Sequence, residues 1–254
     1  MKQLNDEALN RFMTQMQEAY LVPEIKSRLE KKLISEGLEV KAFQILINMN
    51  KPVEVLLNSE IRGVVKLKSQ KQVQAGETID INSIESIEQF ILLKDDANSA
   101  HITYISLPDD STFLSFSFQY NGLLRWERFK TAKEFNAAAK YALENKLLRA
   151  FHENTFASME SAISALLIAI PDASYLTSRK HNAWHRRINK WGQLGNVDVK
   201  YIELFNQLSL NRSRARYSFE EFQMNEAEAK QIAGTCHSFL EFVEASMTEY
   251  HRGE

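Results

Sequence analysis

The residue with the clearest potential for chemistry is Arg212, an arginine in an apolar position. In the segment 201–217, a helical rotation of ~100° per residue places these apolar side chains on one side: Tyr201, Leu204, Phe205, Leu208 and Ala215. Arg212 falls within this apolar arc, one turn after Leu208. A guanidinium group stays charged, and burying it without a partner costs several kcal/mol. We therefore expect an anion beside Arg212, either a carboxylate of a neighbouring helix in a structural pair or a phosphate of a ligand.

Three further candidates follow Arg212 in the stretch RSRARY. Arg214 and Arg216 lie on other faces of the expected helix, so neither occupies an apolar position. Tyr217 could donate a hydrogen bond to a phosphate or to a carboxylate. The alternative for Tyr217 is a buried phenol whose hydroxyl has a partner within the protein. Arg212 is therefore the residue that most requires a partner of opposite charge.

The segment before this helix carries two histidines, His181 and His185, four residues apart. On a helix this spacing lets two imidazoles bind one metal ion. However, no carboxylate shares their face, and the neighbouring Arg186, Arg187 and Lys190 would repel a cation. We therefore predict no metal site and no cofactor.

The same segment interleaves basic and aromatic side chains, which is typical of a surface that contacts RNA. His181 and His185, together with Trp184 and Trp191, could meet phosphates and bases in a groove. The structural alternative is that His181, Trp184 and Ile188 pack against a neighbouring helix. The residue pattern leaves both alternatives open.

Positive charge is concentrated between residues 176 and 217. The whole chain of 254 residues has a formal net charge of −2. The segment 176–217 has nine basic residues and two acidic ones, so it carries +7 and the rest of the chain carries −9. Local positive charge in an acidic protein is the pattern expected of an anion-binding face. We predict that the nucleic-acid-binding residues are Arg179, Lys180, His181, Arg186, Arg187, Arg212, Arg214 and Arg216.

The first part of the chain predicts helices followed by an antiparallel sheet. Apolar residues recur every three or four positions in 3–36, and Pro23 begins a second helix there because proline suits the first helical turn. From 38 to 120, β-branched residues alternate with polar ones between turn signals. The sequences HITYISL and TFLSFSFQY flank a PDDS turn and form the clearest hairpin. We expect five or six antiparallel strands in 38–120.

Capping residues mark helix starts in the second part of the chain. Thr131 and Glu134 form a capping box, in which each side chain would satisfy a free backbone amide of the other residue. Asp198 would cap the helix that carries Arg212, and Asn225 would cap the final helix. These signals indicate several helices joined by short loops.

The predicted fold is α+β. Residues 1–125 are expected to form N-terminal helices and an antiparallel β domain. Residues 131–254 are expected to form a bundle of four or five helices.

Composition and missing motifs limit the classes of function. Cys236 is the single cysteine and lies on an apolar helical stripe, which excludes an internal disulfide and predicts a core residue. No apolar run approaches the ~20 residues of a membrane span, and the first residues lack a signal-peptide core. We therefore predict a cytoplasmic protein with no membrane partner. The chain lacks a Walker loop and the motifs GxGxxG, HExxH and GxSxG, which argues against nucleotide hydrolases and dehydrogenases.

The run RSRARY on a late helix of a small bundle resembles the HEPN superfamily (higher eukaryotes and prokaryotes nucleotide-binding). It is most similar to bacterial members that carry an R-x-R-A-x-Y run. The resemblance extends over SRKHNAWHRRINKWG, over VDVKY leading into LFNQL, and over the closing helix EAEAKQIAGTCHSFLEFVE. It covers about residues 131–250, and no family is recognised in residues 1–125.

The resemblance implies a helical homodimer with a basic groove and a role near RNA, nucleotides or a bacterial toxin–antitoxin or defence system. Ribonuclease members carry an arginine followed four to six residues later by a histidine, and the two act across a dimer interface. Arg212 matches the arginine, but residues 217–219 are Tyr-Ser-Phe and provide no histidine. We therefore predict a degenerate ribonuclease motif in a protein that binds RNA or nucleotide.

Two alternatives remain open. The first is a metal-independent ribonuclease in which His185 or Tyr217 replaces the missing histidine, so that the candidate catalytic residues are Arg212, Tyr217 and His185. The second is a non-catalytic interaction module, in which the bundle forms a homodimer and the β domain binds a protein partner.

Overall fold

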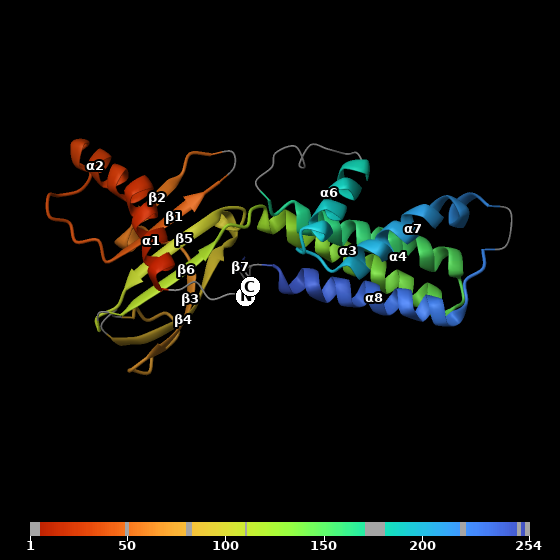
Figure 1. Ribbon diagram of the computed structural model, residues 1–254. Helices are drawn as coiled ribbons and strands as arrows, with labels where there is room; N and C mark the ends of the chain where they lie inside the picture. The colour runs from red at the N-terminus through yellow and green to blue at the C-terminus, as the bar shows by residue number, and fades with distance from the viewer. Residues whose placement is uncertain are drawn as a thin grey trace. The chain divides into compact units, whose positions relative to one another are not determined.

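The computed structural model describes residues 6–48, 51–79, 83–109, 111–170, 181–218, 222–247 and 250–251. The chain forms two compact units (Figure 1). The first unit consists of Met1–Phe118 together with Glu249–Glu254, and the second consists of Gln119–Thr248.

The first unit begins with helices that cover a sheet. Helix α1 (Asp6–Met16) continues through a π-helical turn, η1 (Gln17–Leu21), into α2 (Val22–Glu30). Pro23 lies in the first turn of α2, as predicted, directly after the π-helical turn. The ring of Phe12 lies 5.6 Å from that of Phe116 and 5.9 Å from that of Phe118, measured between centroids. These aromatic contacts attach α1 to the last strand of the sheet.

Two sheets follow in this unit. The four-stranded sheet has the order β2-β1-β5-β6, and all its neighbouring strands are antiparallel. Its strands are β1 (Ala42–Ile47), β2 (Glu54–Leu57), β5 (Ala100–Ser106) and β6 (Thr112–Ser117). The three-stranded sheet has the order β3-β4-β7. Its strands are β3 (Val64–Ser69), β4 (Ile84–Leu93) and β7 (Tyr250–His251), with the short helices η2 (Asn58–Glu60) and η4 (Lys94–Asp96) in the connections.

Most of this architecture agrees with the sequence prediction. The structure describes β1 to β6 between residues 42 and 117, which confirms the expected antiparallel strands. β7 was not predicted, and it pairs with β4 in parallel. A two-residue strand carries too short a pattern for sequence periodicity to reveal.

A small polar network lies inside the four-stranded sheet. Gln44 and Thr103 are fully buried on neighbouring strands, and the Gln44 amide donates to Thr103 Oγ1 at 3.3 Å. Gln44 also exchanges two hydrogen bonds with the backbone of Arg62, at 3.0 and 3.1 Å. His101 Nδ1 lies 3.2 Å from Thr103 Oγ1, and burial lowers the pKa of His101 to about 4. The network therefore holds a neutral imidazole in the sheet at neutral pH.

The second unit is a bundle of α-helices, as predicted (Figure 1). Its described helices are α3 (Gly122–Glu144), α4 (Leu148–Leu167), α6 (His181–Gln193), α7 (Val199–Tyr217) and α8 (Glu226–Ala245). α4 contacts α3, α6, α7 and α8, so it forms the centre of the bundle. Cys236 on α8 is 1% exposed, which confirms its prediction as a core residue.

The predicted helix caps had different outcomes. Asp198 accepts a hydrogen bond from the backbone N–H of Lys200, and Asn225 accepts one from that of Glu228, so both caps are confirmed. The capping box at Thr131 is wrong, because α3 begins nine residues earlier, at Gly122. Thr131 lies inside α3 and donates to the carbonyl of residue 127 at 3.0 Å. The earlier turns bury side chains in the bundle core, and this packing outweighs the local capping signal.

Arg125 is buried at the end of the bundle where α4 and α8 terminate. Its side chain is 2% exposed, and burial lowers its pKa to about 10. Its Nε donates to the carbonyl of Ala165 at 3.0 Å, and Nη2 donates to Ser246 Oγ at 3.2 Å. Nη1 donates to the side-chain oxygen of Gln119. The guanidinium therefore satisfies groups near two helix C-termini, where backbone carbonyls lack partners within their own helix.

We expect Arg125→Met to lower the free energy of unfolding of the helical unit by about 2–4 kcal/mol, because buried acceptors lose their donors. Urea unfolding followed by circular dichroism at 222 nm measures the change. Arg128→Met is the matched control, since Arg128 is exposed on the same helix. Equal stability of the two variants would contradict this role for Arg125.

We expect the sheet that contains His101 to lose stability as the pH falls from 6.5 to 4. The unfolded chain takes up a proton near pH 6.5, whereas the buried imidazole takes one up only near pH 4. The loss is about 2–3 kcal/mol. Hydrogen exchange of the β1 and β5 amides, corrected for intrinsic rates, measures it at pH 7 and pH 4. His101→Gln should show a smaller difference between these two pH values, and an equal difference would contradict the assignment.

Candidate functional site

The candidate site lies where one face of α4 meets the C-terminal half of α7. Arg149, His152, Glu153 and Phe156 recur at spacings of three and four residues, so they share one side of α4. The ring of Phe156 stacks on that of Phe205 from α7, with centroids 5.5 Å apart. This apolar contact fixes the two helices together, and the charged residues lie one and two turns further along.

Arg212 occupies the apolar arc that the sequence predicts, and it has a partner there. Its side chain is 28% exposed, with its Cζ atom 4.4 Å from the centroid of the Phe156 ring. A guanidinium over an aromatic face is attracted to the negative face of the ring. Its Nε lies 3.6 Å from Glu153 Oε2. Of the two expected anions, the structure therefore contains the carboxylate.

Glu153 forms ion pairs with two arginines. Its Oε2 also accepts a hydrogen bond from Nε of Arg216, and this bond raises the pKa of Arg216. One carboxylate against two guanidinium groups leaves the cluster of Glu153, Arg212 and Arg216 with a net charge of +1. Within the described ranges, the buried Nε of Arg212 has no hydrogen-bond acceptor. Oε1 of Glu153 is also buried without a hydrogen-bond partner there. What the Glu153–Arg212–Arg216 cluster retains for a further anion is its positive charge.

Arg149 fixes the end of α7 that carries this cluster. Its guanidinium donates to the backbone carbonyls of Arg214, Ala215 and Ser218 at 3.2, 2.8 and 3.1 Å. The last carbonyls of a helix lack partners within the helix, so a cation is favourable there. Arg149 therefore holds the final turn of α7 against α4.

His152 is a buried histidine in the same place. It is 1% exposed, and its ring contacts that of Phe222 edge to face at 5.4 Å. Its Nδ1 lies 3.9 Å from Glu153 Oε1, which is beyond hydrogen-bond distance. Neither ring nitrogen has a hydrogen-bond partner within the part of the chain that the structure describes. Burial lowers the pKa of His152, Glu153 opposes the shift, and the charge of Arg212 adds to it.

The sequence prediction missed both His152 and Glu153. Their segment reads as an apolar helix with Phe151, Phe156 and Met159, so two adjacent polar residues did not stand out. The signal that could have found them is their spacing from Phe156. A polar residue three or four positions from a core aromatic must lie on or beside a buried face.

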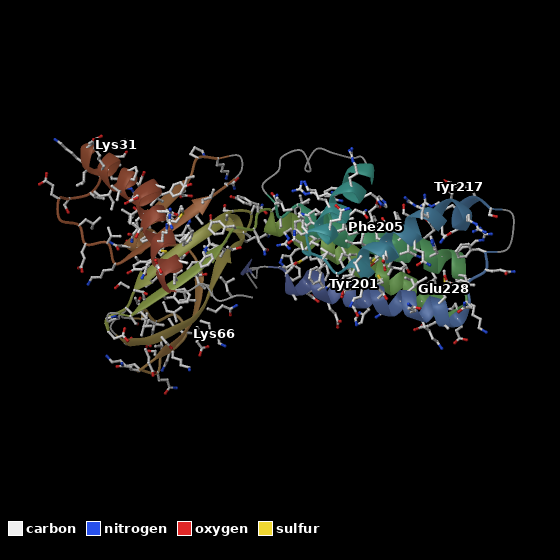
Figure 2. All side chains as sticks on the ribbon, viewed as in Figure 1. Lys31, Lys66, Tyr201, Phe205, Tyr217 and Glu228 are labelled. Atoms are coloured by element: carbon white, nitrogen blue, oxygen red, sulfur yellow. The ribbon has the colours of Figure 1, made fainter. Side chains whose placement is uncertain are left out.

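The three predicted catalytic candidates are not brought together. Arg212 lies in the cluster, but the ring of His185 on α6 stacks on Phe205 with centroids 4.3 Å apart. Tyr217 is 73% exposed at the end of α7 (Figure 2). His185 therefore packs against α7 nearly two turns before Arg212, and Tyr217 points to solvent.

The predicted nucleic-acid-binding residues are divided among three positions. Arg212 and Arg216 share Glu153, and Arg214 is exposed on the same helix. Arg186 is exposed on α6 and Arg187 is half-buried. Arg179 and Lys180 lie outside the described residues, as does the side chain of His181. Their role in binding stays a prediction.

The C-terminal region matches a known family. Residues 126–246 match the family model of the HEPN domain. This part of the chain is a HEPN domain. The match confirms the resemblance seen in the sequence, and it contains the whole Glu153–Arg212–Arg216 cluster. No family model matches the sheet-containing unit, and no curated protein matches the chain in sequence.

The HEPN domain indicates a function related to nucleotides or RNA, and HEPN domains commonly form dimers. In the described part of the chain, no three metal-ligating side chains come together. No described helix is both long and apolar enough to cross a membrane. Within this HEPN domain, the charged cluster between α4 and α7 brings together Glu153, Arg212 and Arg216.

We expect Glu153→Gln to lower the stability of the HEPN domain by about 1 kcal/mol, because two neighbouring guanidinium groups lose their shared counterion. The loss should shrink in 1 M salt, since salt screens the repulsion between the arginines. Urea unfolding at low and high salt measures both effects. Glu144→Gln, at the exposed end of α3, is the control. A loss that does not change with salt would show that charge is not the cause.

Proposed function

We propose that the HEPN domain binds RNA or a nucleotide through the Glu153–Arg212–Arg216 cluster, without cleaving it. The observation that supports this most directly is the excess of charge, since two guanidinium groups share one carboxylate. Guanidinium groups bind phosphate with paired, directional hydrogen bonds. A phosphate would supply the acceptors and the negative charge that Glu153 alone does not.

The exposure of the cluster suits a ligand from solution. The side chains of Arg212 and Arg216 are 28% and 42% exposed, so their remaining N–H groups can be reached. Arg149 and the Phe156 contact hold the two helices in place, so the arginines are positioned before a ligand arrives. Arg186 is exposed on α6, and we propose it as a separate phosphate contact along the strand.

Because Arg212 lies among apolar side chains, its role in binding can be tested separately from its role in stability. When Arg212 is replaced, Glu153 still pairs with Arg216, so no buried carboxylate is left without a counterion. A methionine at position 212 can occupy the place of the guanidinium over the Phe156 ring, so the change costs the fold little.

We expect Arg212→Met to weaken binding of single-stranded RNA at least 10-fold, while stability stays within about 1 kcal/mol of the original. The slope of log K against log salt should fall by about 1, as expected when one phosphate contact is lost. Fluorescence anisotropy at several salt concentrations measures both quantities. Arg128→Met is the matched control, because Arg128 is an exposed arginine on α3 outside the cluster. Unchanged RNA affinity when Arg212 and Arg216 are both replaced by methionine would overturn the proposal.

RNA cleavage is the second candidate function, and the position of His152 favours it. This histidine lies beside Glu153 and Arg212, although neither of its ring nitrogens is exposed to solvent. We expect intact RNA after incubation of structured and single-stranded substrates with the protein. Cleavage that His152→Asn abolishes, or that His185→Ala or Tyr217→Phe abolishes, would replace the proposal of binding alone.

The wider setting remains a proposal that rests on the family resemblance. We infer a homodimer formed through the helical bundle, a protein partner for the sheet-containing unit, and a role in a bacterial toxin–antitoxin or defence system. A molecular mass equal to one chain, measured by light scattering, would contradict the inferred homodimer.

A further inference from the structure

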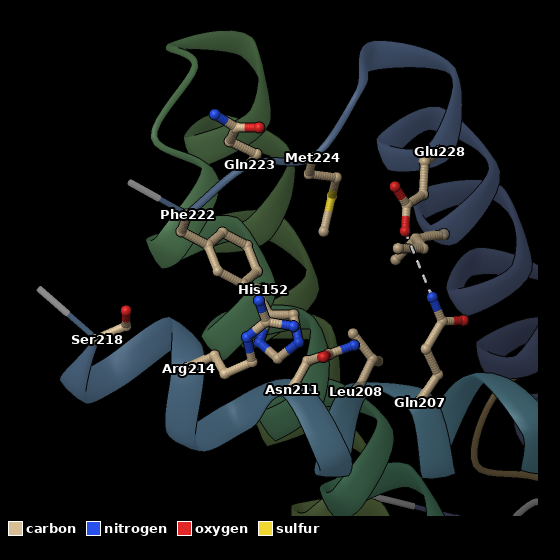
Figure 3. A pocket seen from close by; sticks show the side chains of 11 residues that line it. His152, Gln207, Leu208, Asn211, Arg214, Ser218, Phe222, Gln223, Met224 and Glu228 are labelled. Atoms are coloured by element: carbon tan, nitrogen blue, oxygen red, sulfur yellow. Dashed lines mark hydrogen bonds between the residues drawn. The ribbon is translucent and has the colours of Figure 1, made fainter. Parts of the chain in front are cut away.

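A pocket opens beside the Glu153–Arg212–Arg216 cluster, between α4, α7 and the start of α8. Its volume is about 490 Å³, which is within the range of small-molecule sites. Figure 3 shows side chains from the three helices and from the segment before α8 pointing into it. The lining residues on which the inference depends are His152, Gln207, Asn211, Arg214, Phe222 and Glu228.

His152 on the pocket wall is an independent sign of a ligand. It is 1% exposed, yet neither of its ring nitrogens meets a hydrogen-bond partner among the described residues. A buried polar group without a partner costs about 1–3 kcal/mol. Because burial keeps the imidazole neutral, one nitrogen donates and the other accepts. His152 therefore offers a donor and an acceptor to a group that reaches the inner wall.

The other lining residues restrict the class of ligand. Gln207 and Asn211 offer amide donors and acceptors, and Gln207 Nε2 already donates to Glu228 Oε1 at 3.4 Å. The carboxylate of Glu228 would repel a bare phosphate. A purely apolar ligand would leave the amides and His152 without partners. A planar ring with both donors and acceptors on its edge satisfies these groups, and Phe222 provides an aromatic surface for it.

The position of Arg214 adds a second requirement. It lies exposed on the rim of the pocket, on a different side of α7 from Arg212 and Arg216, which face Glu153. A ligand that fills the pocket with a planar ring can therefore place an anionic group against Arg214. Mixed amide edges inside and cations outside match a nucleobase that carries a phosphate.

We propose that this pocket binds one unpaired nucleobase, with the phosphate of the same nucleotide at Arg214. The inference rests on the proposed function, because the arginine cluster would hold the neighbouring phosphates. The nucleotide can be part of an RNA strand or free, and the recognising chemistry is the same in both cases.

The test compares a base-containing ligand with its base-free counterpart. Calorimetric titration of the full chain with AMP, GMP, CMP and UMP should find at least one that binds 10-fold or more tightly than ribose 5-phosphate. In the NMR spectrum of the unmodified protein, that nucleotide should shift the His152 ring resonances and ribose 5-phosphate should not. Equal affinity for all five compounds, or unchanged His152 resonances, would overturn the proposal.

Variants locate the base within the pocket. Asn211→Leu and Phe222→Leu should each reduce nucleotide affinity to the level of ribose 5-phosphate, with unchanged thermal unfolding. Phe118→Leu is the matched control, because Phe118 is a partly exposed phenylalanine of the other unit. Unchanged nucleotide affinity in both pocket variants would also overturn the proposal.

A last comparison separates this inference from the proposed function. An RNA oligonucleotide and an abasic strand of the same length are titrated into the original protein and into Arg212→Met. Strong binding of both strands, equally weakened by Arg212→Met, would support the arginine cluster and overturn the base pocket. If the protein binds a nucleotide more tightly than ribose 5-phosphate but does not bind RNA, the pocket is a site for a free nucleotide. The same result would overturn the proposal that the arginine cluster binds RNA. Competition between RNA and the nucleotide for the pocket would support a base from the strand.

Discussion

Two guanidinium groups that share a single carboxylate hold the C-terminal half of α7 against the central helix of the bundle. α4 is packed on several sides, so a buried polar residue on it costs free energy unless it finds a partner inside the protein. Glu153 meets this requirement with Arg212 and Arg216, and Arg149 meets it with the last carbonyls of α7. These contacts, together with the stacked rings of Phe156 and Phe205, set the position of the C-terminal half of α7.

The same arrangement separates the groups that stabilise the HEPN domain from those available to a ligand. The carbonyls at the end of α7 and the stacked rings of Phe156 and Phe205 are satisfied within the protein. The arginine cluster and His152 are not fully satisfied, and they lie next to each other where α4 meets α7. Incompletely paired groups next to a rigid frame are what a preorganised binding site requires.

Residue patterns predicted the parts of the structure that depend on local chemistry. Helix spacing alone showed that Arg212 lies within an apolar arc and therefore needs an anion beside it. The caps at Asp198 and Asn225 could be predicted because each side chain bonds to a backbone N–H within one turn. The partner Glu153 could not be found in this way, because it lies 59 positions from Arg212 and only the packing of α4 on α7 joins them. The start of α3 was misplaced for a related reason, since burial of its first turns outweighs the capping signal at Thr131.

The strand β7 gives the chain an unusual order of assembly. Tyr250 and His251 pair with Leu92 and Leu93 of β4, although the entire HEPN domain separates them in sequence. During synthesis, the ribosome must complete that domain before the three-stranded sheet can gain its last strand, whereas the helices can pack as soon as they emerge. A fragment that stops after β6 would also expose an edge of β4 that the full chain covers at these two residues, and an uncovered edge strand invites pairing with another chain.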